Sequence, residues 1–281
     1  MNRMPFAPLR RAGLGAALCV FALGALTLAA CEDKPAPTIA PASSALTAAK
    51  PASMGAVKAL VNRATSKVEL VMDAPQEKIR GRAKASTDGE LSIDLDDITK
   101  STGLITVDIS DLEIFQSKAD DSGKFGEEVK NETQNKHAKT WLEISDDTPE
   151  DVRKQNSKVQ FSIKSIEIAG EKSVAAMSGG DRTMTFSATG DFLLHGHKAT
   201  KKIDLMAVFH MEGGKLASVM VKTSKPVPVD LAEFDVKPRD GFGKLAAKTL
   251  DILAPKVNKE ALVTIEFTAA AGGAAAPAKA P

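Results

Sequence analysis

A long stretch of alternating apolar and polar residues, 183–211, constrains the fold of this chain more than any other feature. Its first half keeps apolar side chains on one face up to Leu194, and its second half does so again from Ile203 to Met211. Such alternation is typical of a half-buried antiparallel strand. Residues 195–198 between the halves read as a turn, so the stretch predicts a long hairpin. Because a hairpin with one apolar face is unstable alone in water, other strands must cover that face.

Other β-rich runs occur throughout the region between residues 66 and 268. They are 66–72, 79–85, 91–95, 104–109, 159–168, 216–222, 227–229 and 261–267. The run 79–85 is polar, which predicts an edge strand with a bulge or bend at Gly81. A change of parity at residues 164–165 predicts a β-bulge. Roughly eight antiparallel strands fit either a sandwich or a closed barrel, and periodicity alone does not choose between them.

Two segments have helical character. Residues 126–142 are polar and rich in helix formers, and residues 241–253 carry apolar side chains at helical spacing. The pair Thr148-Pro149 predicts the start of one further short helical turn. The fold class expected is therefore all-β with two short helices.

The first 30 residues read as a secretory signal, with arginines at the start followed by an apolar run. The run ends in Leu28-Ala29-Ala30 before Cys31, which is the pattern of a bacterial lipoprotein signal. We therefore expect cleavage before Cys31 and a lipid on its sulfur; a plain signal peptide or a retained membrane helix are the weaker alternatives. Glu32 favours the outer membrane, facing the periplasm.

This organisation divides the chain into four parts. Residues 1–30 are the signal, and residues 31–59 are a Pro/Ala/Ser-rich segment that reads as a disordered tether. Residues 60–268 form the domain, and residues 269–281 read as a disordered tail.

Composition argues against nucleic acid as a partner. The formal net charge is +1, the lysines are scattered among acids, and the chain has no tyrosine. Binding to phosphates needs a basic excess, and stacking of single-stranded bases needs aromatic side chains.

Several short motifs, in the same order, resemble the YceI-like family. Residues 190–198, GDFLLHGHK, followed by the strand 203–209, resemble the family's signature hairpin. Val68-Glu69-Leu70 with Arg80-Gly81-Arg82 resembles its opening strands. The motifs at 158–161, 231–234 and 257–263 resemble the strand after its central helix and its C-terminal region.

The resemblance implies an exported, eight-stranded, lipocalin-like β-barrel whose lumen binds a polyisoprenoid or an isoprenoid quinone. It implies no enzymatic activity and no cofactor other than such a ligand. The residues expected to face the lumen are Val68, Leu70, Phe161, Ile163, Met184, Phe186, Phe192, Leu194, Ile203, Leu205 and Phe209. The alternative is that these side chains interdigitate in a filled core, as in a structural or interaction protein of the cell envelope.

Few residues suggest other chemistry. His195 and His197 lie in the turn, where a solvated position or a contact with a ligand head group is expected; no third ligand lies near them in sequence, so no metal site is predicted. His137 and Trp141 read as packing on a helix surface. Paired aspartates occur only at turn signals, and no nucleophile motif is present, so no catalytic residues are predicted and a hydrolase is the third reading.

Overall fold

The structure, a computed structural model, describes residues 44–50, 53–237 and 260–272. All of these belong to one compact unit, residues 37–281. In chain order the described elements are β1 (Val57–Ala74), β2 (Glu77–Lys84), β3 (Thr87–Ile93), η1 (Ile98–Lys100), β4 (Thr102–Asp108), β5 (Glu113–Lys118), β6 (Val129–Lys130), α1 (Glu132–Trp141), α2 (Glu150–Asn156), β7 (Lys158–Glu167), β8 (Asp181–Leu194), β9 (His197–Glu212), β10 (Lys215–Thr223), β11 (Val227–Asp230), η2 (Leu231–Phe234) and β12 (Glu260–Ala271).

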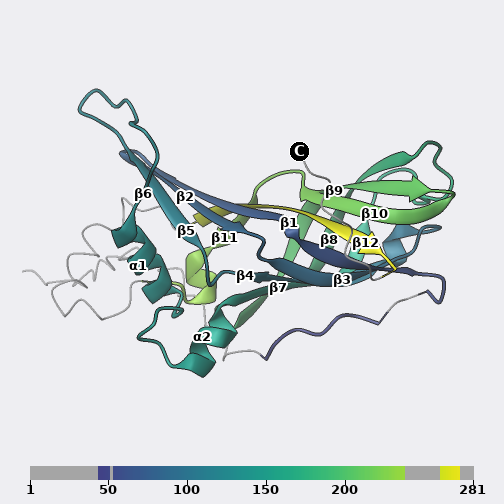
Figure 1. The fold of residues 1–281 in the computed structure, drawn as a ribbon, viewed down its shortest axis with the longest axis horizontal. Coiled ribbons are helices and arrows are strands. Elements are labelled where there is room, and N and C mark those ends of the chain that lie inside the picture. The colour runs from purple at the N-terminus through teal and green to yellow at the C-terminus, as the bar shows by residue number, and fades with distance from the viewer. Residues whose placement is uncertain (1–43, 51–52, 238–259, 273–281) are drawn as a thin grey trace, which may run out of the picture. The chain divides into compact units, whose positions relative to one another are not determined.

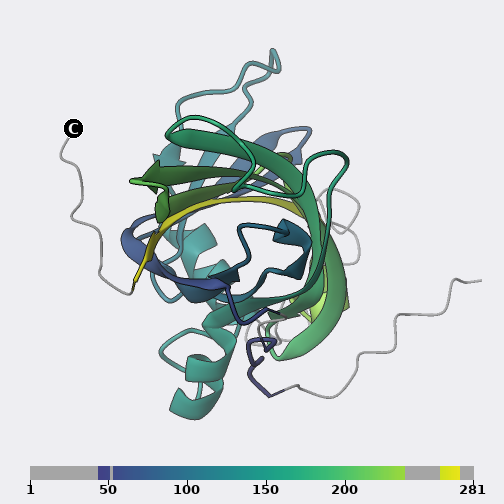
Figure 2. The ribbon, with the colours of Figure 1, turned by 90° about the vertical axis from the view of Figure 1, so that its right-hand side faces the viewer.

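Eight of the strands close into an antiparallel barrel. Their order is β12, β10, β9, β8, β7, β4, β3 and β1, and β1 pairs back with β12. The ring of strands is seen from the side in Figure 1 and end on in Figure 2. The predicted eight-stranded barrel is confirmed, and the sandwich is wrong, because the pairing of β1 with β12 joins the two ends of the sheet.

The hairpin of β8 and β9 is the longest pairing in the barrel. Its register runs from Asp181 opposite His210 to Leu194 opposite His197 without a shift. At its end His195 and Gly196 have φ values of 51° and 73°, which is the backbone form of a two-residue hairpin turn with right-handed twist. The predicted bulge is confirmed, since the register of β7 against β8 shifts between Ile163 and Ser165.

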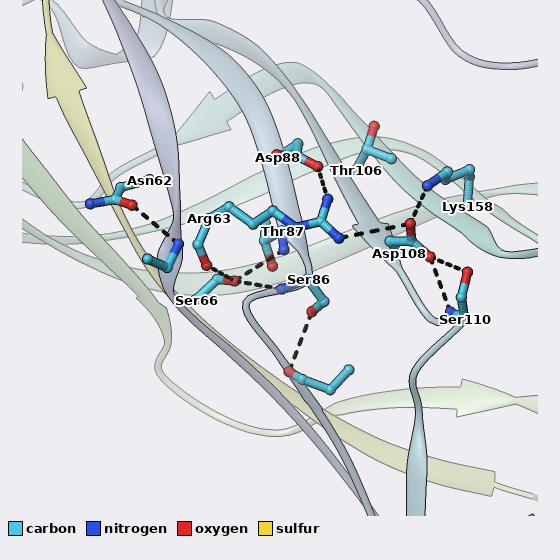
Figure 3. A network of polar contacts seen from close by, with 12 residues as sticks. Asn62, Arg63, Ser66, Ser86, Thr87, Asp88, Thr106, Asp108, Ser110 and Lys158 are labelled. Atoms are coloured by element: carbon cyan, nitrogen blue, oxygen red, sulfur yellow. Dashed lines mark hydrogen bonds and ion pairs between the residues drawn. The ribbon is translucent and has the colours of Figure 1, made fainter. Parts of the chain in front are cut away.

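Strand β1 changes its partner halfway along. Residues 57–60 pair with β3, whereas residues 67–74 pair with β2, and the register with β12 shifts between the two parts. Figure 3 shows the junction. There the hydroxyl of Ser66 accepts hydrogen bonds from the backbone amides of Ser86 and Thr87, each at 3.0 Å. The serine therefore satisfies two buried amides at the point where β2 and β3 separate.

Charged residues hold the outer side of the same junction (Figure 3). The guanidinium of Arg63 lies 2.5 Å from Asp88 and 3.8 Å from Asp108. Asp108 also accepts from the ammonium group of Lys158. These contacts join β1, β3, β4 and β7 at the junction.

Beyond the junction, β2, β5, β6 and β11 extend the sheet around β1 and β12, and we call this part the flared end. Helix α1 is fixed to β5 by Asn135, a buried residue. Its amide oxygen accepts from the backbone amide of Ile114 at 2.8 Å, and its amide nitrogen donates to the carbonyl of the same residue at 2.9 Å. The helix therefore sits directly against the flared end.

Several local expectations are corrected. Strand β2 lies between β1 and β5, so it is not an edge strand, and its register with β1 has no bulge at Gly81. Instead, a Cβ atom at Gly81 would lie 2.5 Å from Cγ of Leu70, so the glycine permits a close approach. Helix α1 begins at Glu132, because residues 129–130 pair as β6 with β5.

The boundaries of the predicted tether and tail also change. Strand β1 starts at Val57, and the backbone amide of Leu46 donates to the side chain of Gln160 on β7 at 2.8 Å. Strand β12 continues to Ala271, so the first residues of the expected tail are part of the barrel. The predicted signal, the lipidated Cys31 and the helix 241–253 lie outside the described residues.

Candidate ligand-binding cavity

A cavity of about 460 Å³ lies inside the barrel and under the flared end. Its wall is almost entirely aliphatic and aromatic, and it draws on nearly every strand of the ring and on α1. Two clusters of buried side chains surround it, one centred on the ring strands and one that includes β5, α1 and η2. Pockets that bind small molecules typically have volumes of 300–1,000 Å³, so this cavity is large enough for a ligand.

The structure brings together the residues that the alternation placed on the inner face. All of them line the cavity except Met184, which is buried in the barrel core at 5% exposure. The lining members are Val68, Leu70, Phe161, Ile163, Phe186, Phe192, Leu194, Ile203, Leu205 and Phe209.

Helix α1 and the strands of the flared end supply lining residues that the sequence analysis missed. Ile79 and Ile114 line this part of the cavity together with His137 and Trp141. The rings of His137 and Trp141 stack with centroids 6.1 Å apart, so the two side chains form a wall of the cavity as well as packing on each other. The spacing of Trp141 four residues after His137 was a usable signal, but nothing in the sequence placed that helix over the barrel.

Polar groups reach the cavity where β2 and β5 lie beside the start of α1. Glu77 lines it there and accepts a hydrogen bond from the side-chain amide of Gln116. The oxygen of the Gln116 amide accepts from Asn131 at 2.5 Å, and Asn131 in turn caps α1. This chain of hydrogen bonds gives one end of an otherwise apolar cavity a polar boundary.

The two histidines of the β8–β9 turn lie elsewhere, since neither is among the residues that line the cavity. His195 is 4% exposed, so the expectation of a solvated position is wrong for it. Its Nδ1 lies 3.0 Å from the carbonyl oxygen of Phe234, and its Nε2 lies 2.9 Å from a carboxylate oxygen of Glu143. His197 is half-buried, and its ring centroid is 6.0 Å from that of His195.

Two of the aspartates that were expected at turns, Asp97 and Asp120, accept hydrogen bonds there. Asp97 caps η1, and the hydroxyl of Thr99 holds the pKa of its carboxyl below the usual value. Asp120 accepts from the hydroxyl of Ser122 within a tight turn, which lowers the pKa of Asp120 in the same way. Carboxylates stabilised in the ionised form at turns are poorly suited to proton transfer.

Within the described residues, no helix combines the length and apolar character needed to cross a membrane. Comparisons with protein-family models and with curated proteins find no match.

Several solved structures are similar to this chain, including the following two. One is the crystal structure of BcnA from Burkholderia cenocepacia, which is 16% identical, with 74% of this chain and 98% of that chain covered and a TM-score of 0.45. The other is a polyisoprenoid-binding domain from Saccharophagus degradans implicated in plant cell wall breakdown; it is 15% identical, with 77% and 99% covered and a TM-score of 0.44.

Proposed function

We propose that this protein binds a long apolar chain, such as a polyisoprenoid or an isoprenoid quinone, inside its barrel and carries or stores it without chemical reaction. The observation that carries the proposal is the apolar cavity of about 460 Å³. A core filled by its own side chains packs like an organic crystal and leaves few voids larger than a water molecule. A cavity of this size therefore argues against a purely structural barrel.

Apolar burial alone supplies enough free energy for such a ligand. Moving one CH₂ group out of water contributes about 0.8 kcal/mol, so a five-carbon isoprenoid unit contributes up to about 4 kcal/mol. Three buried units would give roughly 12 kcal/mol before the loss of freedom on binding, which costs several kcal/mol. Affinity near the micromolar range, about −8 kcal/mol, needs no specific polar contact.

The polar boundary beside α1 suggests how such a ligand would be oriented. Glu77 and His137 line the cavity at the flared end, whereas its other end, beside Ile93, has only the hydroxyl residues Ser101 and Thr102 among its polar lining. A ligand with one polar end would place its tail in the ring and its head near α1, because unpaired polar groups are costly in an apolar wall.

Two measurements test the proposal. Protein purified from the envelope is extracted with organic solvent, and the extract is examined by mass spectrometry for an isoprenoid lipid. Delipidated protein is then titrated with a prenol. Ala207→Trp, which places an indole in the cavity, is expected to weaken uptake at least tenfold, whereas Val208→Trp on the outer face of β9 should leave it unchanged. No extracted lipid and no uptake by the wild type would contradict the proposal.

We also propose that the mature chain is anchored through a lipid on Cys31 and faces the periplasm from the outer membrane. The support is the sequence Leu28-Ala29-Ala30-Cys31 after an apolar run. Several acyl chains on one residue are enough for stable anchoring. Cys31→Ser should move the protein from the membrane fraction to the soluble fraction, and an unchanged distribution would contradict the anchor.

A further inference from the structure

Three segments that are far apart in sequence meet beside the β8–β9 turn. The turn contributes His195 and His197, η2 ends at Asp235, and Glu143 follows α1. One ligating atom from each of His195, His197 and Asp235 lies within 4.8 Å of the other two. We call these three residues together with Glu143 the His-turn cluster.

The spacing of these atoms is close to that of a metal site. Zinc binds imidazole nitrogen and carboxylate oxygen at about 2.0–2.2 Å, so two atoms bound to one ion lie at most about 4 Å apart. A separation of up to 4.8 Å closes to this distance with small rotations of the side chains. His197 and Asp235 are only partly buried, which leaves room for such rotations.

Both ring nitrogens of His195 face hydrogen-bond acceptors, and either acceptor suits the nitrogen that stays off the metal in a metal site. In metal sites the ring nitrogen that does not bind the ion donates to a carboxylate or to a backbone carbonyl. His195 has one acceptor of each kind, with Phe234 at Nδ1 and Glu143 at Nε2. An ion at one nitrogen displaces the acceptor that faces it, and the other nitrogen keeps an acceptor that fixes the ring.

The backbone at the cluster is also unusual. Four non-glycine residues of the described part have positive φ, and three of them are Glu143, His195 and Asp235, with values of 52°, 51° and 54°. Sparsely populated backbone conformations cost free energy and gather at ligand sites, where the surrounding structure maintains them. His195 takes this form in the hairpin turn, Asp235 at the C-terminal cap of η2 and Glu143 just after α1, so three chain reversals bring these side chains to one place.

We propose that His195, His197 and Asp235 bind a divalent transition-metal ion, zinc by preference, with Glu143 as the fourth ligand or as the partner of the second His195 nitrogen. Imidazole with carboxylate is a donor set for zinc and its neighbours, whereas magnesium and calcium prefer oxygen alone. The ammonium of Lys237 lies 2.5 Å from a carboxylate oxygen of Asp235 and competes with an ion for that carboxylate.

The ion would fasten the flared end. Phe234 is fully buried and meets the ring of Phe192 edge to face, with centroids 5.3 Å apart. Phe192 lines the cavity, and Leu142, next to Glu143, does so too. Metal bound at the His-turn cluster therefore ties together the β8–β9 turn, η2 and the end of α1 behind the cavity wall. The site does not depend on which ligand the cavity takes.

The test uses the full mature chain without a histidine tag, treated with a chelator and then titrated with zinc chloride by calorimetry. We expect one zinc per chain, bound at least 100-fold more tightly than magnesium. Asp235→Asn, which suits the left-handed backbone, and His197→Ala should each weaken zinc at least tenfold. Lys237→Ala, which removes a competing cation, should bind zinc at least as tightly as the wild type.

His210 provides the matched control, because it is an exposed histidine paired with Asp181 and Glu212, and it lies at the other end of β9. His210→Ala should bind zinc like the wild type. Cobalt in place of zinc should give the visible absorption of a four-coordinate site in the wild type and lose it in Asp235→Asn. Absence of saturable zinc binding, or loss of binding in His210→Ala instead of the cluster variants, would overturn the proposal.

Discussion

Alanine at Gly81 and at Gly190 tests whether the barrel is hollow, because the added methyl group meets two different kinds of neighbour. At Gly81 the new Cβ would lie 2.5 Å from Cγ of Leu70, a side chain that lines the cavity. At Gly190 it would lie 2.2 Å from the backbone oxygen of Ser162. Neither glycine has positive φ, so only the contacts differ.

The loss of stability in each variant depends on whether the neighbouring atoms can move away from the new methyl group. Leu70 can turn into the cavity, so Gly81→Ala should cost about 1 kcal/mol, the low end for an overpacked site. At Gly190 the backbone of β7 must shift, which weakens hydrogen bonds between β7 and β8. Gly190→Ala should therefore lower the free energy of unfolding by about 3 kcal/mol or more. For a domain of this size these losses correspond to roughly 2–4 °C and 6–12 °C in Tm.

Urea unfolding and calorimetry on the wild type and both variants measure the difference. Gly81→Ala should also lower the capacity for an apolar ligand, because Leu70 then occupies part of the cavity. Equal losses of stability in the two variants would refute the reasoning. They would mean that Leu70 has nowhere to go and that the lumen is filled by its own side chains.

Three further variants test the contacts around the cavity. Ser66→Ala should lower the free energy of unfolding by about 2 kcal/mol in urea, since two buried amides lose their acceptor, whereas Ser178→Ala at an exposed position should change it little. Burial raises the pKa of Asp108, but hydrogen bonds from Lys158 and Ser110 outweigh it and leave the pKa below its usual value. This stabilisation is complete above the ordinary pKa of about 3.9 and is lost as pH falls through the lowered folded value, so in Asp108→Asn unfolding free energy should fall less between pH 5 and pH 2. Asn135→Ala should release a bound apolar probe faster in stopped-flow experiments, because α1 loses its hydrogen bonds to β5; an unchanged rate would show that α1 does not limit exit.

The barrel could be predicted because its strongest pattern is also its most regular pairing. The alternation at 183–211 corresponds to β8 and β9, which pair without a shift, and the parity change at 164–165 marks a real bulge. A period of two reports which face a side chain occupies, and that was enough to place all of the expected lumen residues except Met184 on the cavity wall.

The remaining features depend on contacts between distant segments, which no local pattern encodes. Ser66 looks like an ordinary strand residue, yet it marks where β1 changes partner. Asp235 lies far from the histidines in sequence, and only the packing of η2 against β9 brings it to them. The polar sequence of β2 predicted an edge strand, but β5 pairs with the edge of β2 that faces away from β1.

The most direct test of a ligand-filled lumen is NMR of methyl-labelled protein with a bound prenol. The account predicts contacts between the prenol chain and methyl groups of Ile163, Leu205 and Val219, which line the cavity, and none to Val208 on the outer face of β9. A prenol that contacts only surface methyl groups, or that leaves the spectrum unchanged, would contradict it.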